Sequence, residues 1–252
     1  MVFEGVGVAL ATLFDDSGDV DAAATAAHAG RLVELGVRGI VVAGTTGEAA
    51  TLSVAEREEL LAAVRSTVDG AVPVLAGGGA PSARQAQDLT RRAREGGADG
   101  VLVLSPPMTA DPKPYYEAVV EVAGDMPVLA YHFPKASQPG IPVEALPQLP
   151  VSGCKDSSGE PERLLKALES TSLPLYTGSS ALLGYAGPLG CAGAILALAN
   201  VEPEGCIAAF GGDLDAQRKL TAAHLAMGQR FPRGLKRLMA ERFGTSEVAR
   251  VG

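Results

Sequence analysis

The sequence predicts an α/β protein with a single (β/α)8 TIM barrel and a short C-terminal helical extension. This prediction depends on the 252-residue length, on eight short apolar segments, and on helical segments between most of them. The apolar segments show no alternation, which is typical of parallel strands covered on both faces. They are Gly5–Ala11, Gly39–Ala43, Val72–Ala76, Gly100–Leu104, Pro127–Tyr131, Val151–Lys155, Pro174–Thr177 and Gly193–Leu198.

Amphipathic helical segments separate the apolar segments, and some carry clear end signals. Ser53–Val68 begins with Ser53 and Glu56 in the spacing of a capping box, which satisfies free backbone N–H groups at a helix start. Two glycines close the segment Ser82–Glu95. The other predicted helices are Asp21–Leu35, a helix opened by Asp111-Pro112, Glu162–Glu169, Ala181–Gly187 and Asp213–Arg230.

Alternation of strands and helices favours a parallel sheet, and eight such units close into a barrel. The alternative is an open doubly wound sheet, which usually has a glycine-rich phosphate loop after its first strand. Here Thr12–Gly18 follows that strand and contains no such motif. We expect the barrel to span residues 1–230. Residues 231–252 should hold a short helical segment, Gly234–Phe243, and a loose polar tail, Gly244–Gly252.

Composition excludes several classes of function. The formal net charge is −8 and no cluster of Lys and Arg stands out, so nucleic acid is not an expected partner. No apolar run is long enough to span a membrane, and the N-terminus lacks the pattern of a signal peptide. The three cysteines are scattered without metal-ligand spacing. We therefore expect a cytoplasmic protein without a metal site.

Candidate catalytic residues are sought where predicted strands end, because barrel enzymes place their chemistry there. Lys155 ends the sixth strand, where its side chain would enter the barrel interior. Burial there lowers the pKa of a lysine and frees the amine to attack a ketone. The alternative is a surface lysine after a wrongly assigned strand.

The second strand is followed by Gly44, Thr45, Thr46 and Gly47. Backbone N–H groups in such a loop can form a nest for an anion, and the two hydroxyls add donors that suit a carboxylate. We predict that this loop binds substrate, although an ordinary strand-to-helix turn would have a similar composition.

Tyr131 ends the fifth strand and should direct its phenol to the barrel mouth. A tyrosine there can carry a proton to and from a developing alkoxide, although a strand tyrosine with a purely structural hydroxyl is an open alternative. His132 should point to the opposite face of the strand, and we interpret it as structural.

Together these motifs resemble the dihydrodipicolinate synthase / N-acetylneuraminate lyase superfamily, whose members are class I pyruvate aldolases. The motifs keep the order and spacing of that superfamily across about 230 residues, and all but the last fall at or just after the end of a predicted strand. The matches are Gly44-Thr45-Thr46-Gly47-Glu48, Tyr131-x-x-Pro134, Gly153-x-Lys155-Asp156, Gly178-Ser179 and Gly193-Ala194-Ile195.

The resemblance implies a role for each matched residue. Lys155 would form a Schiff base with pyruvate, and Tyr131 would transfer protons beside it. Thr45 and Thr46 would hold the pyruvate carboxylate, with Thr45 also relaying a proton, and the backbone carbonyl of Ile195 would lie near the substrate. The resemblance also implies a homotetramer or homodimer that needs no cofactor.

Two departures from this pattern count against dihydrodipicolinate synthase itself. In synthases of this family a second tyrosine follows the fourth strand, but here the stretch is Ser105–Met108. An arginine usually follows the Tyr-x-x-Pro motif, but Lys135–Gly140 contains none, and a lysine lacks the bidentate fork of arginine. By contrast, Ala197–Val201 and Gly234–Met239 resemble the 4-hydroxy-2-oxoglutarate and 2-keto-3-deoxy-sugar-acid aldolase branch.

The sequence therefore predicts a Schiff-base aldolase that reversibly cleaves a 2-keto acid to pyruvate and an aldehyde. One alternative is 4-hydroxy-tetrahydrodipicolinate (dihydrodipicolinate) synthase, which condenses pyruvate with aspartate semialdehyde. A second alternative is a catalytically weak barrel that binds a keto acid.

Overall fold

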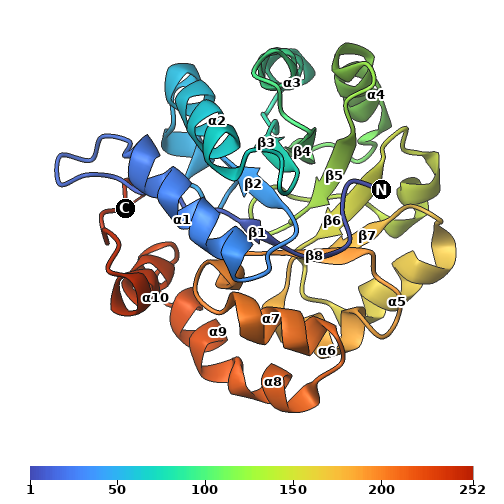
Figure 1. The fold of residues 1–252 in the computed structure, drawn as a ribbon. Coiled ribbons are helices and arrows are strands. Elements are labelled where there is room, and N and C mark those ends of the chain that lie inside the picture. The colour runs from blue at the N-terminus through green and yellow to red at the C-terminus, as the bar shows by residue number, and fades with distance from the viewer. Residues whose placement is uncertain (252) are drawn as a thin grey trace.

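The computed structural model describes residues 1–251 and shows a closed barrel of eight parallel strands in chain order (Figure 1). The barrel closes where Gly5 of the first strand pairs with Gly193 of the last. The predicted strands are thus confirmed, although most are shorter at their ends. They are β1 (Gly5–Ala9), β2 (Ile40–Val42), β3 (Val74–Gly77), β4 (Gly100–Leu104), β5 (Val128–His132), β6 (Gly153–Asp156), β7 (Leu175–Thr177) and β8 (Gly193–Leu196).

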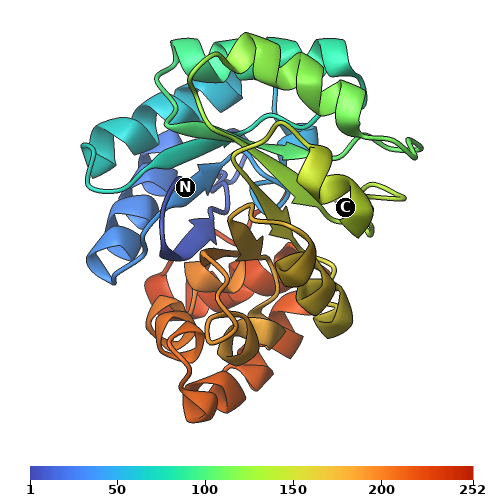
Figure 2. The same cartoon turned by 90° about the vertical axis from the view of Figure 1, so that its right-hand side faces the viewer.

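Helices surround the barrel, and Figure 2 shows α2, α3 and α4 along one side with the helices of the C-terminal third along the opposite side. The helices are α1 (Ala22–Glu34), α2 (Val54–Val68), α3 (Ala83–Glu95), α4 (Lys113–Ala123), α5 (Pro161–Ser170), α6 (Leu183–Ala186), α7 (Pro203–Phe210), α8 (Leu214–Lys219), α9 (Thr221–Gly228) and α10 (Arg233–Phe243). Short 3-10 turns lie at Ala49–Thr51, Val143–Gln148, Ser180–Leu182 and Leu198–Asn200.

Side chains alternate between the inside of the barrel and the layer beneath the helices, as the pleat of a strand requires. On β4, Leu102 belongs to the inner cluster, whereas Val101 and Val103 pack against the helices. Tyr131 and Ile195 also belong to the inner cluster. The interior is therefore a packed apolar core up to the level of the candidate site.

The capping box predicted for α2 is confirmed. Ser53 Oγ accepts a hydrogen bond from the Glu56 backbone N–H at 3.3 Å, and the Glu56 carboxylate accepts one from the Ser53 N–H at 2.7 Å. This cap fixes where the chain leaves the loop after β2 and enters the helix.

Three helix predictions differ from the structure. Helix α7 was not predicted, because its sequence PEGCIAAF is short and mostly apolar and so lacks an amphipathic pattern. The helix predicted over Asp213–Arg230 is two helices, α8 and α9, which meet at the buried Leu220. The helix predicted over Ala181–Gly187 is a 3-10 turn followed by the single-turn α6.

The prediction of a loose C-terminal tail is wrong. The segment up to Val251 is docked beside the loops that follow β1 and β2, because Arg250 donates to Gly18 O and the Val251 N–H donates to the Glu48 carboxylate. In Figure 1 the red ribbon that follows α10 runs toward α1. Arg250 donates hydrogen bonds to the backbone oxygens of Gly18 and Thr51 and to the Glu56 carboxylate. A polar side chain with five donors thus anchors a segment whose composition is typical of a free tail.

Within residues 1–251, no helix combines the length and the apolar character needed to cross a lipid bilayer.

Candidate active site

Lys155 lies inside the barrel, near the carboxyl end of β6. In the strand register it stands between Tyr131 of β5 and Tyr176 of β7, and it is 4% exposed. Gly178 leaves room for the lysine stem, because a Cβ at this position would lie 3.0 Å from Lys155 Cε and 1.8 Å from Ser157 Oγ. The sequence prediction that the Lys155 side chain enters the barrel is confirmed.

Burial changes the acid–base state of this lysine. Desolvation lowers the pKa of Lys155 from 10.5 to about 7. Near neutral pH a large share of the side chain is therefore an uncharged amine, which is the form that attacks a carbonyl carbon.

Tyr131 lies against the lysine. The Lys155 Nζ is 4.3 Å from the centroid of the Tyr131 ring, and the ring of Phe133 is stacked with this tyrosine at 5.9 Å between centroids. Burial raises the pKa of Tyr131, while the hydroxyls of Ser157 and Thr45 act in the opposite direction. The phenol therefore keeps its proton near neutral pH and has two hydroxyl groups as neighbours.

The loop after β2 forms the next part of the site. Gly44 O accepts a hydrogen bond from the Ala49 N–H at 3.2 Å, and Gly47 O accepts one from Thr12 Oγ1 at 2.8 Å. Thr45 is exposed at the barrel mouth, whereas Thr46 is buried. The loop is thus tied at both glycines, and its first hydroxyl faces the open end of the barrel.

The backbone on either side of this loop is strained. Ala43 and Glu48 have positive φ values of 49° and 56°, a region that costs roughly 1–3 kcal/mol for a residue other than glycine. Gly77 at the end of β3 makes the arrangement possible, because a Cβ there would lie 2.1 Å from Ala43 O. The loop therefore keeps a shape that the surrounding structure imposes.

A polar cluster lies on the outer face of β6, the face opposite the Lys155 side chain. Asp156 forms an ion pair with Arg163 at 2.6 Å, and Arg163 also donates to Ile141 O at 2.7 Å. His132 Nδ1 accepts a hydrogen bond from the Ile141 N–H at 2.8 Å. Burial lowers the pKa of His132 to about 4, so the ring stays neutral. These contacts give His132 the structural role that the sequence predicts.

The structure therefore brings Lys155, Tyr131 and Thr45 together, and places Ile195 in the inner core on β8. Ser157 is a residue of the site to which the sequence prediction gave no role. The signal for it was present, because Ser157 lies two residues beyond Lys155, in the segment that continues β6 into the barrel mouth.

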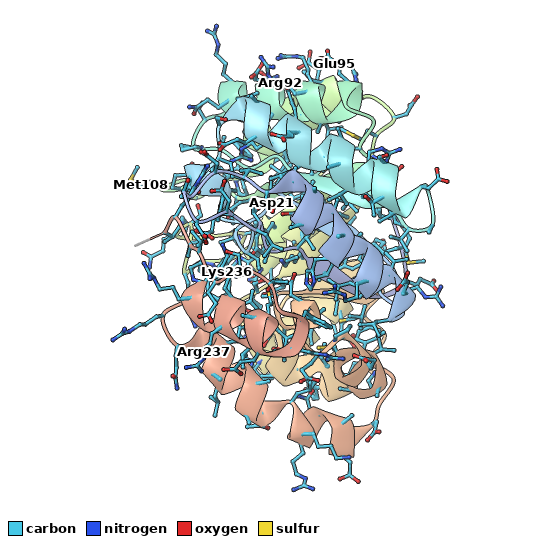
Figure 3. All side chains as sticks on the ribbon, turned by 60° about the vertical axis from the view of Figure 1, so that its left-hand side comes forward. Asp21, Arg92, Glu95, Met108, Lys236 and Arg237 are labelled. Atoms are coloured by element: carbon cyan, nitrogen blue, oxygen red, sulfur yellow. The ribbon has the colours of Figure 1, made fainter. Side chains whose placement is uncertain are left out.

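Each of the two stretches that depart from the family pattern has an exposed residue, Met108 in one and Lys135 in the other. Met108 is 92% exposed and projects from the molecule (Figure 3), with a φ of 55°. Near Thr45 a cavity of about 1030 Å³ opens, and Leu104, Phe231 and Val251 contribute to its lining. Residues 1–251 hold no group of three or more His, Cys, Asp or Glu side chains arranged for a metal ion.

Comparison with known proteins identifies the family of this chain. Residues 2–246 match the dihydrodipicolinate synthetase family. A DapA-like lyase of Halobacterium salinarum, named as uncharacterised, is 38% identical over 79% of this chain and 68% of its own length. A 4-hydroxy-tetrahydrodipicolinate synthase of Natronomonas pharaonis is 37% identical over 84% of this chain and 76% of its own length.

Solved structures show the same fold. The dihydrodipicolinate synthase of Thermotoga maritima superposes with a TM-score of 0.93 at 25% identity, over all of this chain and 92% of that one. A prophage protein of the same family from E. coli K12, solved in complex with pyruvate, gives a TM-score of 0.88 at 25% identity over 99% and 91%. Because the family match extends along almost its whole length, the chain belongs to the dihydrodipicolinate synthetase family and is a pyruvate-dependent carbon–carbon lyase of the class I aldolase type.

Proposed function

We propose that Lys155 forms a Schiff base with the keto carbon of pyruvate and that the protein makes or breaks a carbon–carbon bond beside this carbon. The observation that carries the proposal is a buried lysine with its Nζ 4.3 Å from the ring centroid of a buried tyrosine. The amine adds to C2 of pyruvate, the oxygen leaves as water, and the resulting iminium accepts electrons better than a ketone does. The Tyr131 phenolate then takes a proton from C3, which gives an enamine. The enamine attacks an aldehyde, and the aldehyde oxygen receives this proton.

Each neighbouring residue has a step in this proposal. The hydroxyls and the backbone N–H groups of Thr45 and Thr46 receive the pyruvate carboxylate. Tyr131 donates its proton to the oxygen that leaves as water and takes a proton back when the product is released. Because its pKa is raised by burial, Tyr131 begins the cycle protonated.

For the aldehyde, the relatives favour the synthase alternative over the cleavage reaction. The Natronomonas protein and several further relatives at 33–37% identity are named 4-hydroxy-tetrahydrodipicolinate synthase. We therefore propose condensation of pyruvate with aspartate semialdehyde as the first activity to test.

Cleavage of a 2-keto-3-deoxy acid or of 4-hydroxy-2-oxoglutarate is the second candidate. Two observations support it: Lys135–Gly140 contains no arginine for a second carboxylate, and the exposed Met108 lies in the stretch where the synthases carry a tyrosine.

The Schiff base is tested by incubating the protein with pyruvate and borohydride and then mapping the adduct by mass spectrometry. We expect one reduced pyruvyl group on Lys155 and none in Lys155→Ala. A modified Lys236, or an unmodified protein, would contradict the proposal.

The two reactions are separated by comparing substrates on the same sample. Turnover of aspartate semialdehyde with pyruvate above that of other aldehydes supports the synthase. Faster release of pyruvate from a 2-keto-3-deoxy acid panel supports the aldolase. An adduct on Lys155 without turnover of any of these substrates would instead support a keto-acid-binding barrel.

A further inference from the structure

The last residue of the loop after β2, Glu48, is held by the C-terminal part of the chain. Its Oε1 lies 2.6 Å from Lys236 Nζ, and the two side chains are only 1% and 0% exposed. Oε1 has no well-aligned hydrogen bond, so this contact is ionic. Oε2 accepts a hydrogen bond from the Val251 N–H at 2.7 Å. Both oxygens of this buried carboxylate therefore contact the C-terminal part of the chain.

Lys236 connects three parts of the fold. It comes from α10 and is buried, whereas its neighbour Arg237 is exposed and points in a different direction (Figure 3). Its Nζ donates to Val248 O at 2.6 Å and lies 4.3 Å from the centroid of the Phe14 ring, just beyond β1. Burial lowers the pKa of Lys236, while Glu48 opposes this shift by favouring the charged form.

Arg250 completes this junction. We call residues Ser246–Val251 the C-terminal strap. Its Arg250 donates to Gly18 O at 2.6 Å and to Thr51 O at 3.2 Å, and it forms an ion pair with Glu56 at 2.6 Å. The strap thus joins the loop after β1, the 3-10 turn after β2 and the first turn of α2.

These contacts act on the backbone that leads to the candidate carboxylate site. Glu48 has the left-handed conformation, and its backbone N–H bonds to Thr45 O at 3.2 Å. Fixing the Glu48 side chain therefore fixes the backbone that presents Thr45 and Thr46. A buried ion pair has little net value for stability, because desolvation offsets the attraction of the charges, but it does impose one geometry.

We propose that Lys236 and the C-terminal strap are positioning elements that hold Thr45 and Thr46 in the orientation that receives the carboxylate of pyruvate. This inference rests on the proposed function of the loop. According to this inference, Lys236, which lies outside the barrel strands, affects substrate affinity through its contact with Glu48.

The test compares two keto compounds that differ in one charge. Borohydride trapping on Lys155 is measured against increasing concentrations of pyruvate and of methyl pyruvate, whose ester removes the negative charge. In a variant that ends at Thr245, the half-saturating pyruvate concentration should rise about tenfold, as expected when a charge-assisted contact is misplaced. The value for methyl pyruvate should change less than about twofold, because the amine itself is untouched.

Two further variants separate positioning from folding. Glu48→Gln combined with Lys236→Met leaves no unpaired buried charge, so it should fold, yet it should retain the selective loss of pyruvate affinity. Arg237→Met alters an exposed neighbour on α10 and should leave both half-saturating concentrations unchanged.

Equal increases for the two compounds, or no increase for pyruvate, would overturn the inference. The proposed function fails in a different way, namely if the full chain gives no adduct on Lys155 with either compound.

Discussion

A single residue, Lys155, shows the conflict between stability and chemistry in this protein. Its amine is buried and its pKa is lowered to about 7, because no water solvates the charged form. In the unfolded chain the same group keeps a pKa near 10.5. Folding therefore releases a proton from this lysine near neutral pH, and this release lowers the free energy of unfolding.

We predict that Lys155→Met stabilises the protein while it abolishes trapping of pyruvate. At pH 7 the free energy of unfolding should rise by about 4 kcal/mol, the linkage value for a pKa that folding lowers from 10.5 to about 7. The cost of the lysine is complete at and below its folded pKa of about 7 and disappears above its unfolded pKa of 10.5. Urea denaturation of both proteins between pH 6 and pH 10.5 measures the difference, which should shrink as the pH rises. A difference that stays constant over this range would argue against a depressed pKa.

Some residues of the site could be predicted from sequence and others could not. Lys155 and Tyr131 each lie one residue before the end of an apolar strand, so their place near the barrel mouth follows from the sequence pattern. The contact between Lys236 and Glu48 could not be predicted in this way, because the two residues are distant in sequence and no local pattern pairs them. A buried ion pair between remote elements depends on tertiary packing, which a single sequence does not reveal.

At the scale of elements, the glycines at strand ends shape the site. Gly77 allows the loop after β2 to lie against β3, and Gly178 after β7 leaves room for the side chains that extend from β6. In both cases glycine is needed because neighbouring atoms lie too close for a Cβ, and not because the glycine has an unusual backbone angle.

Gly178→Ala should therefore damage the site without unfolding the barrel. Its new Cβ would overlap Ser157 Oγ at 1.8 Å and press on Lys155 Cε at 3.0 Å, and both are side-chain atoms that can move. A displacement of about 1 Å at a reacting group can cost about a hundredfold, so we expect a loss of this size in the rate of pyruvate trapping. Gly228→Ala is the matched control, since nothing lies within 4 Å of its Cβ position. Equal trapping rates in the two variants would contradict this account.

The elements also show where sequence patterns are sufficient. The eight strands were predictable because each is a short apolar run between turn residues. Helix α7 and the break between α8 and α9 were not predictable. Their sequences show no clear helical periodicity, because their side chains fit the packing of neighbouring elements. The docked strap was missed because its anchors, Gly18 and Thr51, lie in loops far from it in the chain.

At the scale of the whole molecule, the barrel must join its first and last strands. β1 and β8 pair along their length, from Gly5 with Gly193 to Val8 with Leu196. Beyond the sheet, the fully buried Asn200 extends this seam. Its Nδ2 donates to Ala9 O at 2.8 Å, and its Oδ1 accepts from the Ala11 N–H at 3.0 Å.

We predict that Asn200→Ala weakens the entire barrel rather than one corner of it. The substitution leaves a buried N–H and a buried carbonyl without partners, so the free energy of unfolding should fall by roughly 2–4 kcal/mol. Gln87→Ala is the comparison, because this half-buried amide makes one hydrogen bond, to Ala118 O at 2.9 Å, and its loss should cost about 1 kcal/mol. Urea denaturation followed by circular dichroism should show one transition for Asn200→Ala, with a lower midpoint and an unchanged slope. Two separate transitions, or a loss no larger than that of Gln87→Ala, would mean that the seam does not control the stability of the whole barrel.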